Sequence, residues 1–246
     1  MFKHQGESRT LQHNLQIATV LSFVAGIVNA TGFLAIRQLT TNVTGHFALF
    51  IYDVANVQFW KGTIYFLYIF SFLFGSFTSG FLIEQFKTNQ RLNVFVIPTL
   101  IECFILLSLA ISSNIFNHLW PDVIACLLLF AMGLQNSYVT KISNAVVRTT
   151  HLTGLFTDLG IELSQLFFPK AHPQIDTIKS NIKLRLYIIC FFFLGGLVGG
   201  FLFANIGWKL NTLFLAAFIL LISLFYDDIR YSYSVTKRKL KHKIKG

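Results

Sequence analysis

Charge is scarce in this sequence. Lys, Arg, Asp and Glu together make up 12% of its 246 residues, whereas about a quarter is usual for a soluble domain. Hydrophobic residues make up 54%, and the mean hydropathy is +0.62. So few charges cannot cover a soluble surface. The composition therefore predicts a polytopic all-α membrane protein, with the lipid bilayer as its main partner.

Acidic residues are the scarcer charged type, with 10 Asp and Glu against 20 Lys and Arg. In a membrane protein such an excess marks cytoplasmic loops rather than a nucleic-acid site. Seventeen of the 20 basic residues fall in residues 1–14, in the loop after 62–83, in the loop after 121–140 counted as far as Arg185, and in the basic tail 227–246. The opposite side of the membrane would carry only three basic residues, namely Arg37, Lys61 and Lys209. We expect both termini to be cytoplasmic, at a bacterial inner (plasma) membrane, and no nucleic-acid partner.

Sequence features of enzymes and metal proteins are also missing. The three cysteines lie inside apolar runs and make no disulfide framework. There is no GxSxG, HExxH or P-loop motif. His46 with Asp53, and His151 with Asp158, are each seven residues apart, but no third metal ligand accompanies either pair. The sequence predicts no enzyme, no catalytic residue, no metal and no cofactor.

Six apolar runs are long enough to cross a bilayer core about 30 Å thick, which takes about 20 helical residues. They cover residues 15–36, 62–83, 93–112, 121–140, 184–206 and 208–226. Pro98 falls inside the third run, where we expect a kink. Pro121 opens the fourth run, where proline is well tolerated.

The two halves of the chain, residues 15–112 and 121–226, carry matching motifs in the same order. AGIVN (25–29) resembles MGLQN (132–136), TTNVTG (40–45) resembles TTHLTG (149–154), and FLFGSFTSGFL (72–82) resembles FFLGGLVGGFL (192–202). Three spans in each half force the halves into opposite orientations. The sequence therefore predicts an inverted 3+3 repeat, an architecture common in secondary transporters.

A Thr/Gly-rich segment follows the first span of each half. Residues 43–57 and 153–168 are amphipathic and too short for a comfortable crossing. We interpret them as re-entrant or broken half-helices that begin at Thr44-Gly45 and Thr153-Gly154. Thr can cap such a helix, and its free N–H groups can hold an anionic or carbonyl group. Full spans, giving eight helices, and helices lying at the interface remain alternatives.

The candidate site residues are polar groups in or beside these segments. Those expected to bind a solute are Asn29, Thr41, Asn42, Thr44, Gly45, Gln135, Asn136, Thr150, Thr153 and Gly154. Those expected to carry a coupling ion are Asp53, Glu102, Asp158 and Glu162. An ionisable group at membrane depth is costly unless it is paired, which makes it a functional candidate. The alternatives are a hydrogen-bonded carboxyl facing the bundle for Glu102 and a solvated helix face for the other three.

The chain resembles the YoaK-like family of bacterial membrane proteins. The resemblance rests on GIVNATGFLAI (26–36), TTNVTGHFALF (40–50), MGLQNSYVTKIS (132–143) and TTHLTGLFTDLG (149–160). It covers about residues 15–226. The family motif more often reads Thr-Gly-Asn where this chain has Thr44-Gly45-His46. The resemblance implies a multi-pass inner-membrane protein with no established activity.

The leading functional hypothesis is a secondary-transporter-like permease for a small solute. Its site would lie between the two halves. The alternative is a non-transporting scaffold or sensor that assembles into an oligomer through glycine-rich helix faces. Small residues four apart in 75–80 and 195–200 suit such close packing of helices.

Overall fold

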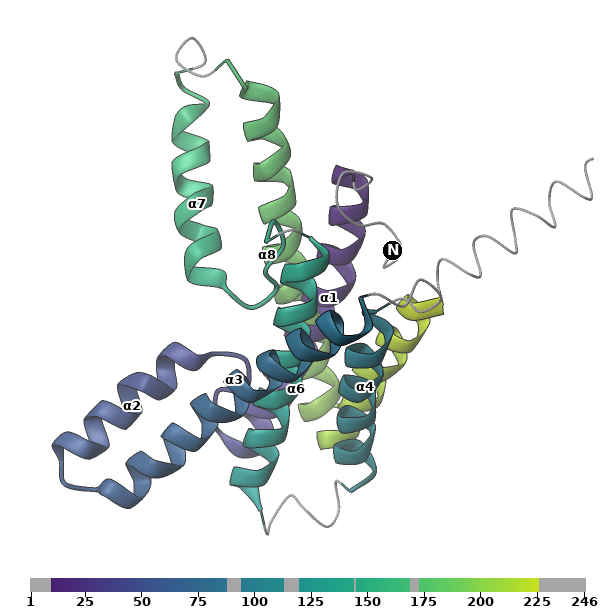
Figure 1. Ribbon diagram of the computed structural model, residues 1–246. Helices are drawn as coiled ribbons and strands as arrows, with labels where there is room; N and C mark the ends of the chain where they lie inside the picture. The colour runs from purple at the N-terminus through teal and green to yellow at the C-terminus, as the bar shows by residue number, and fades with distance from the viewer. Residues whose placement is uncertain (1–9, 88–93, 113–119, 144, 169–172, 226–246) are drawn as a thin grey trace, which may run out of the picture.

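The computed structural model describes residues 10–87, 94–112, 120–143, 145–168 and 173–225, and the secondary structure in these ranges is helical (Figure 1). The helices are α1 (Leu11–Ile36), α2 (Val43–Ala55), α3 (Phe59–Phe86), α4 (Val96–Ile111), α6 (Pro121–Ile142), α7 (Leu152–Gln165) and α8 (Ile175–Ala204). A last helix, Lys209–Phe225, opens with the 3-10 turn η3 (Lys209–Thr212). The predicted tail 227–246 and most of the tail 1–14 lie outside the described residues.

Four helices are long and apolar enough to cross a membrane: α1, α3, α6 and α8, with 26, 28, 22 and 30 residues. The chain is therefore a multi-pass helical membrane protein. The predicted runs 93–112 and 208–226 also form apolar helices, but α4 has 16 residues and the last helix is likewise short. A 16-residue helix rises about 24 Å, which is less than a bilayer core of about 30 Å. The count of six spans stays a prediction.

Two details of the predicted spans were wrong. Helix α8 begins at Ile175 rather than 184, so Lys179, Lys183 and Arg185 lie on a helix and not in a loop. The helix extends through these charges because α7 packs alongside this part of the chain. The expected kink at Pro98 is also absent from α4, because the helix begins at Val96 and the proline falls in its first turn, where it breaks no hydrogen bond.

Glycines allow the long helices to cross with their backbones in contact. A Cβ on Gly26 of α1 would lie 2.1 Å from the carbonyl oxygen of Phe192 in α8. A Cβ on Gly133 of α6 would likewise lie 2.2 Å from the carbonyl oxygen of Phe72 in α3. Such distances exclude any side chain, as expected for small residues at membrane helix interfaces. The pairs α1–α8 and α3–α6 make the most extensive helix contacts in the described structure.

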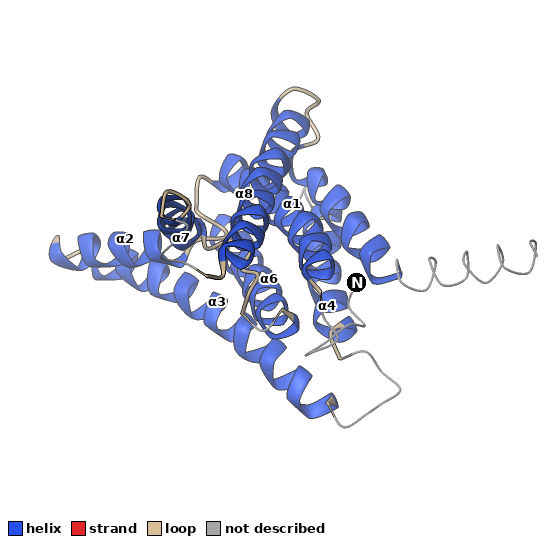
Figure 2. Ribbon diagram, turned by 90° about the horizontal axis from the view of Figure 1, so that it is seen from above, coloured by secondary structure: helices blue, strands red, loops and turns tan. Residues whose placement is uncertain are grey.

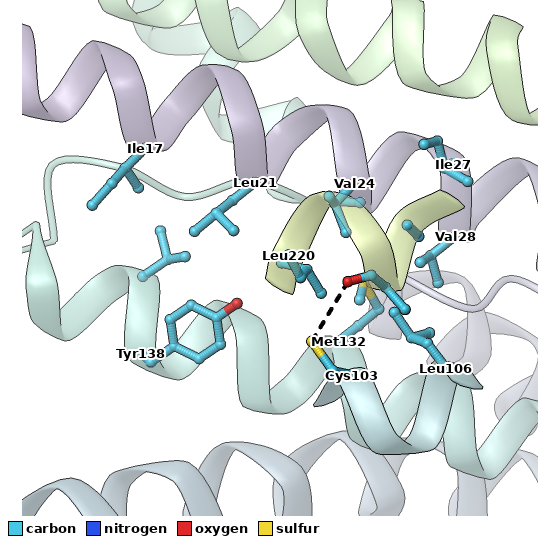
Figure 3. Packing of buried hydrophobic residues seen from close by; sticks show 14 of the residues in the cluster. Ile17, Leu21, Val24, Ile27, Val28, Cys103, Leu106, Met132, Tyr138 and Leu220 are labelled. Atoms are coloured by element: carbon cyan, nitrogen blue, oxygen red, sulfur yellow. Dashed lines mark hydrogen bonds between the residues drawn. The ribbon is translucent and has the colours of Figure 1, made fainter. Parts of the chain in front are cut away.

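The main apolar core lies where α1, α4, α6 and the last helix meet. Figure 3 shows Leu21 of α1, Cys103 of α4, Met132 of α6 and Leu220 of the last helix pointing toward one another. The Cys103 Sγ lies 3.8 Å from the carbonyl oxygen of Ala217. The cysteine therefore acts as a small buried hydrophobe, in keeping with the usual behaviour of free cysteine.

Two short helices pair with the long helix that follows each of them. In both ribbon views α2 lies beside α3 at the edge of the molecule (Figures 1 and 2), and α7 packs on α8. They have 13 and 14 residues, close to the predicted amphipathic segments 43–57 and 153–168. These hairpins place the two Thr/Gly-rich segments at the starts of α2 and α7.

Candidate functional site

Each Thr/Gly-rich segment is tied by a threonine hydroxyl to the helix that precedes it. Thr41 Oγ1 donates to Asn29 Oδ1 of α1 at 2.8 Å. Thr150 Oγ1 donates to Asn136 Oδ1 of α6 at 3.0 Å. The same pair of residue types therefore closes the same turn in both halves. These four predicted binding residues are brought together in pairs, and their hydrogen bonds hold the loops.

A buried amide connects the second segment to the centre of the bundle. Gln135 Nε2 donates to the carbonyl oxygen of Leu21 in α1 and to Oγ1 of Thr149, both at 3.0 Å. Its Oε1 has no hydrogen-bond partner in the described part of the chain. Because burying a polar group is costly unless it is bonded, this amide fixes the start of the loop against both α1 and α6.

The N-cap residue of each short helix lies two positions before the threonine of the Thr-Gly pair, which corrects the expectation that threonine caps these helices. Asn42 is the N-cap of α2, and its side chain accepts a hydrogen bond from the Gly45 N–H at 3.3 Å. Thr44 and Thr153 lie in the first turns and are exposed. An amide oxygen at the N-cap reaches the third N–H of the helix, so threonine is not needed for that bond.

The start of α7 differs from that of α2. His151 is the N-cap residue but makes no capping hydrogen bond through its side chain. Its ring lies over Gly154, where an added Cβ would be 2.7 Å from Cδ2. A larger residue at Gly154 would push this ring away. The first-turn N–H groups of α7 therefore lack the side-chain acceptor that α2 has in Asn42.

Two predicted coupling residues share one arginine. Arg185 of α8 donates through Nε to Glu162 Oε2 at 2.8 Å and through Nη2 to Oε1 at 3.0 Å. Its Nη1 lies 2.9 Å from Asp158 Oδ2. Glu162 and Asp158 are four residues apart on α7, and so project from one face of that helix. The solvated-face alternative is therefore wrong for Glu162, whose side chain is 11% exposed.

A pocket of about 490 Å³ opens beside this ion-pair network. Its walls come from the α6–α7 loop, the first half of α7 and the first third of α8. The lining residues are Ala145, Val146, Arg148, His151, Gly154, Leu155, Asp158, Asn181, Leu184 and Arg185. They belong to the second half of the chain. The predicted residues Gly154 and Asp158 line it, whereas Asn42, Thr44 and Gly45 of the first segment do not.

The equivalent place in the first half is aromatic rather than ionic. His46 is fully buried, with Nε2 2.6 Å from the carbonyl oxygen of Leu39. Its ring stacks on Tyr65 and meets the edge of Tyr68, with centroids 5.9 and 5.0 Å away. Asp53, aligned with Glu162 in the sequence, is also buried. The two halves therefore carry different chemistry behind their Thr/Gly turns.

Glu102 occupies a separate place in the apolar core. It is fully buried, and Tyr138 donates its hydroxyl to Oε2 at 2.7 Å. Its Oε1 has no hydrogen-bond partner in the described residues. The hydrogen-bonded, bundle-facing position matches the alternative given for this residue. It does not line the pocket at α7.

The family model for "Protein of unknown function (DUF1275)" matches residues 17–226 of the chain. The chain belongs to this family. No curated protein and no solved structure matches the chain. The DUF1275 match spans both Thr/Gly-rich segments and supports the family resemblance seen in the sequence, but it assigns no residue a role.

For this DUF1275 chain, sequence reasoning missed the residue that organises the pocket. Arg185 was counted as a loop charge, although it lies on α8 and holds both carboxylates of α7. Two carboxylates at positions i and i+4 on a short amphipathic helix were the available signal, since such a face needs a nearby cation. Arg148 and His151 of the pocket wall were likewise not among the predicted binding residues.

Proposed function

We propose that the protein is a secondary-transporter-like permease for a small solute, built as an inverted repeat of three spans and one short half-helix. It would lie in a bacterial inner membrane with both termini in the cytoplasm. The proposal includes no enzymatic activity, no cofactor and no nucleic-acid partner. The domain limits stay those predicted, with repeats at 15–112 and 121–226.

Matched contacts in the two halves support the inverted repeat. Gly26 and Phe192 join α1 to α8 in the same way that Gly133 and Phe72 join α6 to α3. The reciprocal contacts follow the same pattern. A Cβ on Gly195 would lie 2.0 Å from the Phe23 oxygen, and one on Gly75 would lie 2.1 Å from the Phe130 oxygen. In Figure 1 the first helix of each half runs in opposite directions, α1 downward and α6 upward.

The observation that carries the transport proposal is the pocket at the start of α7. In about 490 Å³ it combines the first turn of α7, Asp158 and Arg185, and the same arginine is held by Glu162 outside the lining. A helix terminus can bind an anionic or carbonyl group. Transporters with inverted repeats aim the N-termini of half-helices at anionic substrate groups at the interface of the repeats, whereas this pocket is lined by the second half alone.

The glycine rows argue against the scaffold alternative. Gly75, Gly195 and Gly199 are buried by helices of the same chain. They are therefore not available to a second copy. An oligomer would need another surface.

Flux measurements in vesicles test the proposal. The full chain is reconstituted into liposomes and offered a panel of neutral, cationic and anionic small solutes, with and without an imposed pH gradient. We expect uptake of at least one class, reduced in Gly154→Leu because the added side chain meets His151 and intrudes on the pocket. Gly160→Ala, where nothing lies within 4 Å of the added Cβ, is the matched control. Vesicles that take up no member of the panel contradict the proposal.

A further inference from the structure

The pocket at α7 holds two arginines in different electrostatic states. Arg185 is 21% exposed and bonded to two carboxylates. Arg148, in the α6–α7 loop, also lines the pocket, is exposed and makes no ion pair with any described residue. The lining residues therefore carry two guanidinium groups against the single carboxylate of Asp158. Glu162 lies behind the wall.

The two carboxylates hold Arg185 with unequal strength. Glu162 binds it through two parallel hydrogen bonds and is 11% exposed. Asp158 makes one contact, from Nη1 to Oδ2, and is 50% exposed. A bidentate, largely buried pair is the stronger arrangement, whereas a half-exposed pair contributes about 1 kcal/mol or less. Asp158 is therefore the partner that another anion can displace.

We propose that the pocket binds a small solute through a carboxylate or phosphate oxyanion, which takes the place of Asp158 at Nη1 of Arg185. Glu162 stays bonded and holds the guanidinium in position. Arg148 supplies the second cation, and Gly154 brings the first turn of α7 to the same space. This inference rests on the proposed function and names its solute class.

The size and the lining of the pocket suit a solute of metabolite size. Gly154 and the His151 ring that lies over it line the pocket at the first turn of α7. Asn181 of α8 adds an amide that can bond a hydroxyl or carbonyl elsewhere on the solute. About 490 Å³ accommodates a molecule of metabolite size.

Binding to the purified full chain tests the inference without requiring transport. Titration calorimetry in an uncharged detergent uses acetate, succinate and inorganic phosphate as probes. We expect at least one probe to bind. We expect Asp158→Asn to bind it up to about fivefold more tightly, because the competing carboxylate is gone. Asp176→Asn removes the same charge from α8 outside the pocket wall and should leave the affinity unchanged.

Two arginine substitutions should weaken binding at the same site. Arg185→Lys should weaken binding by at least about tenfold, because an ammonium cannot hold Glu162 and the solute in one plane. Arg148→Gln should weaken binding by up to about fivefold. Lys179→Gln removes a positive charge from α8 near Arg185 but outside the pocket lining, and it should leave the affinity unchanged. Arg148→Gln leaves the buried ion pair intact and so reports on binding if Arg185→Lys fails to fold.

The outcomes separate this inference from the proposed function. An oxyanion that binds but is never transported overturns the permease proposal and leaves the inference standing. Transport of neutral solutes, with no binding of the three probes, overturns this inference and leaves the permease proposal standing. Equal affinities for wild type and Asp158→Asn would also overturn the inference. So would probe binding that is lost in phosphatidylglycerol nanodiscs but kept in phosphatidylcholine nanodiscs, because the occupant would then be a lipid headgroup.

Discussion

At the scale of single residues, the second half of the chain places its charges in one network and the first half does not. Arg185 joins two carboxylates of α7. The corresponding part of the first half has His46 packed against two tyrosines of α3. Because an arginine-carboxylate network is costly to break once it is partly buried, we expect the two carboxylates to differ sharply in their effect on stability.

Glu162→Gln should lower the free energy of unfolding by about 1–3 kcal/mol, since it leaves a partly buried guanidinium without its bidentate acceptor. Asp158→Asn should cost less than about 1 kcal/mol because that pair is half exposed. Thermal unfolding of the purified variants in the same detergent measures both. Equal losses of unfolding free energy in the two variants would contradict the conclusion that Glu162 binds Arg185 more strongly than Asp158 does.

Glu102 makes a prediction of its own. Glu102→Gln keeps the shape of the side chain and an acceptor for the Tyr138 hydroxyl, so the protein should still fold. If Glu102 carries the coupling proton, uptake by the variant should no longer respond to a pH gradient. Tyr138→Phe is the companion variant, and it should destabilise the fold by about 1–3 kcal/mol because the carboxyl loses its donor. If uptake by Glu102→Gln still responds to the pH gradient, Glu102 does not carry the coupling proton.

At the scale of helices, the glycine crossings make specific demands on side-chain size. Gly26→Ala should destabilise by about 1–3 kcal/mol, because its Cβ would meet a backbone oxygen that cannot move without shifting α8. Gly160→Ala should instead stabilise α7 by about 0.5–1 kcal/mol, since its surroundings are open and alanine favours a helix. Unfolding midpoints of the two variants test the contrast. A tolerated Gly26→Ala would mean that α1 and α8 are farther apart than described.

Element boundaries also show how far the sequence could lead. The apolar runs at 15–36, 62–83 and 121–140 match α1, α3 and α6 within a few residues, because hydropathy marks the part of a helix that crosses the hydrocarbon core. The start of α8 could not be read this way. Its first residues carry Asp176, Lys179 and Lys183, and they are helical because α7 lies alongside. Arg185 was missed for the same reason, since its partners are brought close by tertiary structure.

The Thr/Gly turns illustrate the opposite case. The pairing of Thr41 with Asn29 and of Thr150 with Asn136 could be anticipated, because both residues of each pair recur at matching places in the two halves. The cap of α2 could not be assigned to Asn42 rather than Thr44 from residue type alone, since both suit that position. The choice depends on where the backbone leaves the extended region, which is at Asn42.

At the scale of the whole molecule, the proposed inverted repeat predicts which sides of the membrane the equivalent turns face. In a variant with the three native cysteines replaced, Arg37→Cys and Ala145→Cys place one thiol after α1 and one after α6. We expect an impermeant maleimide added to intact cells to label Arg37→Cys alone, because Arg37 is assigned to the outer side. It should label Ala145→Cys after the cells are opened. Labelling of both from the outside would contradict the inverted arrangement.

The crossings of α1 with α8 and of α3 with α6 have a consequence for assembly. Each long helix of the first half has its main partner in the second half. During synthesis α1 therefore has no α8 to pack against until nearly the whole chain has been inserted. Neither half alone can cover its glycine surfaces. Cutting the chain between α4 and α6 and coexpressing the pieces should therefore yield two fragments that stabilise each other, whereas either fragment alone should be degraded. Each half of the chain would thus depend on the other for its stability, as the two subunits of an obligate dimer do.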